Sequence, residues 1–147
     1  MSRAKSRPRT AVTNERRQSG RPLRILVADD EPDTVLTLSL ILQNEGHIVQ
    51  GVFSGADAVL VARQFRPDAV ILDISVPGLS GYAVAQAIRH SFTDMRRPLM
   101  IAISGVWKDP PDRQLAHKVG FDHYLIKPCS PSELLGLLNA IRGAAAA

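Results

Sequence analysis

The stretch Ile25-Leu26-Val27-Ala28-Asp29-Asp30 is a short aliphatic run that ends in two acidic residues. Two later runs have the same form: residues 69–72 end at Asp73, and residues 124–126 end at Lys127. Short aliphatic runs bounded by charged and turn residues are typical of buried parallel strands. Ligands of an open α/β sheet bind beyond the carboxyl ends of its strands. The sequence therefore predicts a site that contains three carboxylates and one ammonium group.

Strand and helix patterns alternate along the chain in five units. We predict strands at 24–28, 48–53, 69–73, 99–103 and 123–126, and helices at 32–45, 55–66, 81–91, 110–119 and 131–142. Such units form a parallel sheet with right-handed crossovers and helices on both faces. The expected fold is α/β, a flavodoxin-like three-layer sandwich whose five-stranded parallel sheet has the order 2-1-3-4-5, with five helices. This order brings Asp29, Asp30 and Asp73 into one crevice, with Ser104 and Lys127 at neighbouring strand ends.

Length and composition limit the class of protein. The chain has 147 residues, 45% of them hydrophobic, which suits about one domain with a substantial core. No apolar stretch reaches the roughly 20 residues that span a bilayer, and no secretory signal is visible. The single cysteine, Cys129, excludes an internal disulfide framework and a cysteine-rich zinc site. We expect a cytoplasmic protein without a membrane span.

Positive charge is concentrated at the N-terminus. Residues 1–22 carry seven basic residues and one acidic residue, so their net charge is +6 and that of the remainder is −2. Such a segment either tethers the protein to nucleic acid, a membrane or an acidic partner, or is a disordered leader. We favour the leader over nucleic-acid contact, because no aromatic residue lies between the arginines to stack on bases. The expected organisation is a basic leader (1–22), one domain (23–143) and a C-terminal tail (144–147).

The acidic cluster indicates metal-assisted phosphoryl chemistry. Three carboxylates in one crevice need a counter-charge, and oxygen ligands favour Mg²⁺ or Mn²⁺ over zinc. An aspartate such as Asp73 can attack phosphorus to form an acyl phosphate. Lys127 and the hydroxyl of Ser104 could then hold phosphoryl oxygens, because phosphoryl transfer depends mainly on positioning and charge stabilisation.

Four motifs occur at the predicted strand ends: VADDE at 27–31, ILDISVPGLSG at 71–81, AISG at 102–105 and YLIKP at 124–128. With these motifs the chain resembles the receiver (CheY-like) domain of two-component response regulators over about residues 23–143. The resemblance implies that the protein is a phosphorylation-activated signalling switch of a phosphorelay. It would take its phosphoryl group from a sensor histidine kinase or a histidine phosphotransfer protein. It would be no enzyme beyond its own phosphorylation and dephosphorylation.

The resemblance also assigns roles to single residues. Asp73 would be the phosphoacceptor, and Lys127 would contact the phosphoryl group. Asp30 and Asp73 would bind Mg²⁺ directly, Asp29 through a metal-bound water, and Ser75 through its backbone carbonyl. The Lys127-Pro128 peptide bond would be cis.

Ser104 and Tyr124 would form a switch pair that responds to the phosphoryl group. The face made of helix 110–119, strand 123–126 and helix 131–142 would then change shape for a downstream protein or a homodimer. Gly105 replaces the frequent alanine of the family, and Cys129 replaces a large apolar residue. Trp107 could be a partner anchor or a lid over the site.

Other functions remain open at this point. The chain could be a stand-alone receiver without an output domain or a receiver segment of a hybrid histidine kinase. A Mg²⁺-dependent aspartyl-phosphate phosphatase of the haloacid dehalogenase type is disfavoured, because Ser75 stands where that class needs a second acid. An FMN carrier is disfavoured because the acidic residues 29–31 would repel the phosphate of FMN.

Overall fold

A computed structural model of the chain describes residues 21–74, 81–92, 97–104 and 120–146, with side chains as far as Ile141. The expected helix at 110–119 lies outside these residues. Five parallel strands form one sheet in the order β2-β1-β3-β4-β5, as the sequence predicts. The strands are β1 (Arg24–Ala28), β2 (Ile48–Val52), β3 (Ala69–Asp73), β4 (Leu99–Ser104) and β5 (His123–Ile126).

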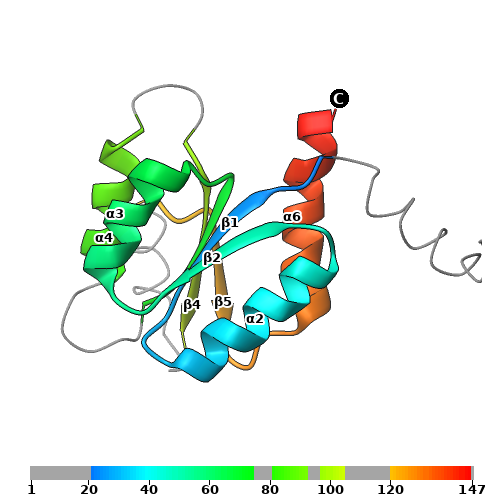
Figure 1. Cartoon of the computed structure of the whole chain (residues 1–147), viewed down its shortest axis with the longest axis horizontal. Helices are drawn as coiled ribbons and strands as arrows, with labels where there is room; N and C mark the ends of the chain where they lie inside the picture. Colours follow the sequence, from blue (N-terminus) through cyan, green and yellow to red (C-terminus); the bar gives the residue numbers. More distant parts are fainter. Residues whose placement is uncertain (1–20, 75–80, 93–96, 105–119, 147) are drawn as a thin grey trace, which may run out of the picture.

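Helices cover both faces of this sheet. The described helices are α2 (Pro32–Asn44), α3 (Gly55–Phe65), α4 (Gly81–His90) and α6 (Pro131–Ala146). Figure 1 shows α3 and α4 together on one face and α2 with α6 on the other. Alternate residues of each strand therefore enter two different cores. In β1, Leu26 packs on the α3–α4 side and Ile25 on the α2–α6 side, and both are fully buried.

Local capping fixes where the elements begin and end. Gly46 adopts a positive φ of 94° after α2, a left-handed conformation that glycine takes readily and that ends the helix. The Ser54 side chain accepts a hydrogen bond from the Asp57 amide at 3.1 Å and caps α3. The last helix runs to Ala146 instead of ending at residue 142. The run of alanines after Gly143 has the highest helix propensity, which accounts for the difference.

The strand register brings the functional ends to one edge. Ala28 pairs with Val52 on one side and with Leu72 on the other, and Ser104 pairs with Ile126. The residues that follow these positions therefore emerge together. No helix in the described part of the chain is long and apolar enough to cross a membrane.

Candidate functional site

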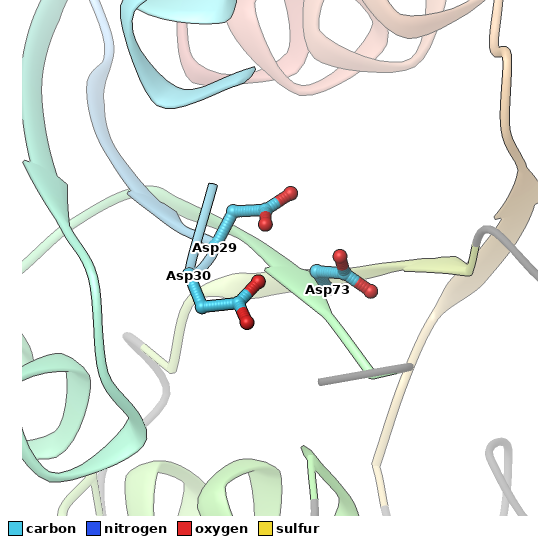
Figure 2. A group of neighbouring side chains, drawn as sticks. All are labelled: Asp29, Asp30 and Asp73. Atoms are coloured by element: carbon cyan, nitrogen blue, oxygen red, sulfur yellow. The ribbon is translucent and has the colours of Figure 1, made fainter. Parts of the chain in front are cut away.

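Three carboxylates meet at the carboxyl edge of the sheet. Asp29 and Asp30 follow β1, and Asp73 is the last residue of β3 (Figure 2). One oxygen from each carboxylate lies within 4.8 Å of the others. Asp29 and Asp73 are buried, at 5% and 6% exposure, whereas Asp30 is exposed. The neighbouring strands thus place two desolvated acids beside a third that faces solvent.

Lys127 lies between the two buried acids. Its Nζ donates to Oδ2 of Asp73 at 2.8 Å and to Oδ2 of Asp29 at 3.0 Å. Burial alone, the largest single influence, would lower the pKa of Lys127. The hydrogen bonds and charges of Asp73 and Asp29 outweigh burial, so the pKa of Lys127 is raised. The lysine therefore stays protonated and provides one positive charge to three carboxylates.

The surroundings of Asp29 disfavour the charged form of its carboxylate. Burial raises its pKa, and the nearby charge of Asp73 acts in the same direction. The Glu31 amide donates to Asp29 Oδ1 at 3.0 Å, and this bond together with Lys127 opposes the rise without cancelling it. The single ammonium thus leaves the cluster short of positive charge, and a cation there would relieve the repulsion.

The donor chemistry fits a hard divalent cation. All three candidate side-chain ligands are carboxylates with oxygen donors, as Mg²⁺ and Mn²⁺ prefer, and none is a sulfur or imidazole ligand typical of zinc. An open cleft of about 300 Å³ adjoins them and gives space for a cation, water and a phosphoryl group. The backbone carbonyl of Ser75, the expected fourth ligand, lies outside the described residues.

Ser104 and Tyr124 come from the two strands next to the acids. Ser104 ends β4 and is fully buried. Its carbonyl accepts a hydrogen bond from the Lys127 amide at 2.7 Å, which joins the serine to the lysine through the backbone. Tyr124 in β5 is half-buried and packs against the α3–α4 core. The peptide bond between Lys127 and Pro128 is cis, as the resemblance implies.

Several residues of the cleft were not predicted from the sequence as site residues, Phe53 and Ser54 among them. Phe53 and Ser54 line it beside the carboxylates, and the Phe53 side chain is 52% exposed. Both follow β2, so the strand order that gathers the acids also brings this segment to the same edge. The expected strand at 48–53 already placed both residues near this edge. Neither side chain is charged, so nothing in the sequence marked them as site residues.

A parallel sheet in this order, with three carboxylates and a lysine at its carboxyl edge, is the arrangement of a receiver domain. The family model of the response regulator receiver domain matches residues 25–139, and the chain belongs to this family. It is thus a phosphorelay signalling domain of two-component systems, whose members interact with histidine kinases or phosphotransfer partners.

Similar proteins differ in their overall length. The chain is 36% identical to PilH of Pseudomonas aeruginosa over 80% of the chain and 96% of PilH. It is 33% identical to the DNA-binding response regulator MtrA of Mycolicibacterium smegmatis over 80% of the chain but 49% of MtrA. The chain thus spans nearly all of PilH and about half of MtrA.

Solved structures agree with the fold. The receiver domain of the sensor histidine kinase PA1611 from Pseudomonas aeruginosa has a TM-score of 0.72 and 30% identity, with 83% of this chain and 98% of that one covered. That structure holds a magnesium ion in its active-site cleft. The chemotaxis protein CheY4 of Vibrio cholerae has a TM-score of 0.74 and 25% identity, with 82% and 98% covered.

Proposed function

We propose that this receiver accepts a phosphoryl group from a phosphohistidine donor onto Asp73. The contact between Lys127 and Asp73 at 2.8 Å carries the proposal, because it puts a positive charge beside the attacking carboxylate. An Oδ atom of Asp73 attacks phosphorus while the P–N bond to the donor imidazole breaks. The imidazole keeps the bonding electron pair, and an acyl phosphate forms on Asp73.

Asp30 and Asp73, with Asp29 through a water and Ser75 through its carbonyl, are the proposed ligands of Mg²⁺. When bound, this ion would neutralise charge on the phosphoryl oxygens and hold them in position. Lys127 stabilises a further oxygen by a charge-assisted hydrogen bond. Mn²⁺ has the same ligand preference and is the alternative ion.

Ser104 and Tyr124 are the proposed switch. The new phosphoryl group draws the Ser104 hydroxyl toward it, and the Tyr124 ring turns into the space left behind. The proposed output face, β5 and α6 together with residues 110–119 outside the described part of the chain, then changes for a downstream protein or for a homodimer. Such a change is a shift between two packings, biased by new hydrogen bonds to the phosphoryl group.

The match over 96% of PilH supports action as a stand-alone receiver that works through protein contacts, and the proposed location is the cytoplasm. The match to the receiver of a sensor kinase supports the alternative, a receiver segment of a hybrid histidine kinase. In both settings the domain catalyses its own phosphorylation and dephosphorylation and has no separate substrate.

Phosphotransfer tests the proposal. The protein is incubated with acetyl phosphate and Mg²⁺, and phosphate is located by peptide mass spectrometry. An acid-stable, base-labile phosphate on Asp73 is expected, and none in Asp73→Asn. Asp57→Asn, in the exposed first turn of α3, is the matched control and should be phosphorylated normally. Phosphate that persists in Asp73→Asn would assign the acceptor elsewhere.

A further inference from the structure

A second, larger hollow lies at the opposite edge of the sheet, where the strands begin. Its volume is about 1020 Å³, against about 300 Å³ for the carboxylate cleft. Figure 1 shows the start of β1 and the end of α6 at this end of the molecule. Four arginines line it, and we call it the arginine groove: Arg21, Arg24, Arg66 and Arg97.

Positive charge prevails in the arginine groove, although the chain beyond residue 22 carries a net charge of −2. The acids that line it are Asp68 and Asp122, so the arginines exceed them by two. Asp68 accepts two hydrogen bonds from Arg21, at 2.7 and 3.0 Å, and one from the Arg24 amide at 2.8 Å. Asp122 accepts a hydrogen bond from the Met100 amide at 2.8 Å, and its Oδ1 lies 4.0 Å from Nη2 of Arg97, a long ion pair between two partly exposed side chains. Both acids thus have partners within the protein, and the described residues that line the groove carry two more positive than negative charges.

Two of the guanidinium groups lie over buried aromatic rings. The Arg24 guanidinium is 4.2 Å from the centre of Phe65, and its Nε donates to the Phe65 carbonyl at 2.9 Å. The Arg66 guanidinium is 5.0 Å from the centre of Phe92. A guanidinium has five N–H donors, so the Nε bond of Arg24 leaves others for a ligand. These contacts hold planar, charged groups in place before any ligand arrives, which lowers the entropy cost of binding.

Apart from Gln64, the rest of the lining is apolar. Pro67, Pro98, Leu99 and Ile141 contribute side chains between the charged groups. Ligand sites in proteins combine such apolar walls with a few fixed polar groups, at volumes of roughly 300–1,000 Å³. A ligand that suits this lining has phosphate groups for the arginines and a flat ring that can stack on a guanidinium.

We propose that the arginine groove binds a nucleoside di- or triphosphate. Arg66 and Arg97 hold the phosphates through charge-assisted hydrogen bonds, and the base lies against the guanidinium of Arg24. A free nucleotide is favoured over a nucleic acid because the described arginines surround one hollow and do not form an extended track. The groove and Asp73 are at opposite ends of the strands, so the nucleotide and the phosphoryl group can be bound together.

Fluorescence anisotropy with a ribose-labelled guanosine triphosphate tests the proposal on the full chain. EDTA is present, so that no metal–phosphate complex forms at the carboxylates. Saturable binding is expected, with competition by unlabelled nucleotide. The double variant Arg66→Gln/Arg97→Gln should bind at least roughly tenfold more weakly, since each charge-assisted contact contributes about a factor of ten. Arg89→Gln, an exposed arginine of α4 outside the groove, should bind like the wild type.

Further variants and competing ligands test whether the nucleotide binds elsewhere on the protein. Asp73→Asn should keep wild-type affinity, since the groove is distinct from the carboxylate cleft. The full-length variant Arg16→Gln/Arg17→Gln should also keep it. Loss of binding in that variant with retention in the groove variant would move the site to residues 1–20 and overturn the proposal. Tighter binding of a single-stranded oligonucleotide than of the nucleotide would overturn the proposal too. Equal competition by inorganic pyrophosphate would do the same, and so would a titration that does not saturate. Thermal unfolding of the groove variant verifies that it is folded.

Discussion

The ammonium of Lys127 is in contact with the carboxylate of Asp73, with 2.8 Å between Nζ and Oδ2. The residues are 54 positions apart in the chain, and one follows β5 while the other ends β3. Because Lys127 also contacts Asp29, the same ammonium balances both buried acids. An incoming phosphoryl group must therefore compete with the carboxylates for this ammonium, which couples events at Asp73 to the segment after β5.

Removal of the Lys127 charge tests this balance. In Lys127→Met the buried acids lose their counter-charge, so the free energy of unfolding in EDTA should fall by about 1–3 kcal/mol. A divalent cation replaces the missing charge, so Mg²⁺ should stabilise the variant more than it stabilises the wild type. Urea unfolding with and without Mg²⁺ measures both effects. Lys127→Arg keeps the charge and is the matched control; equal Mg²⁺ stabilisation of Lys127→Met and wild type would contradict the argument.

Ser104 tests the proposed switch. Ser104→Ala removes one buried hydroxyl at the end of β4 but leaves the Asp73 carboxylate and Lys127 in place. Phosphorylation of Asp73 should persist but slow by roughly 10- to 100-fold, because a hydrogen bond to the charged phosphoryl group contributes about 1.5–3 kcal/mol. The NMR shifts that phosphorylation causes in β5 and α6 should shrink. Full-sized shifts in the variant would exclude the serine as the link.

Asp68 predicts a pH dependence of stability. Burial would raise its pKa, but the hydrogen bonds from Arg21 and the Arg24 amide outweigh burial, so its pKa is lowered from 3.8. A carboxylate with a lower pKa in the folded state stabilises the protein above its unfolded pKa, and the contribution is lost as the pH falls.

Asp68→Asn should lower the free energy of unfolding by about 1 kcal/mol at neutral pH, a modest figure because Arg21 is half exposed. The difference from the wild type in urea unfolding should shrink below about pH 4. A difference that stays constant down to pH 3 would show that the Asp68 charge does not matter.

The sequence predicted the carboxylate site better than the arginine groove, for a physical reason. Asp29, Asp73 and Lys127 each end an aliphatic run, and parallel topology alone brings such ends together. Arg24 and Arg66 belong to no motif. Their placement depends on rings that become neighbours after folding, and on the left-handed backbone of Arg66 after α3, with φ of 51°. The double contact of Lys127 with two acids likewise depends on the final side-chain packing, which no local pattern encodes.

Gly81 tests how closely α4 approaches β3. A Cβ at this position would lie 2.6 Å from Cγ2 and 2.7 Å from Cα of Ile74, so the backbone itself would have to move. Gly81→Ala should therefore lower the free energy of unfolding by about 1–3 kcal/mol, despite the better helix propensity of alanine.

Gly136 in α6 is the matched control, since a Cβ there meets nothing within 4 Å. Gly136→Ala should stabilise the protein by about 0.5–1 kcal/mol. Urea unfolding of both variants gives the comparison, and the same sign for both would mean that helix propensity, not the contact with Ile74, governs position 81. Because Ile74 directly follows Asp73, the Gly81 variant should also slow phosphorylation, whereas the Gly136 variant should not.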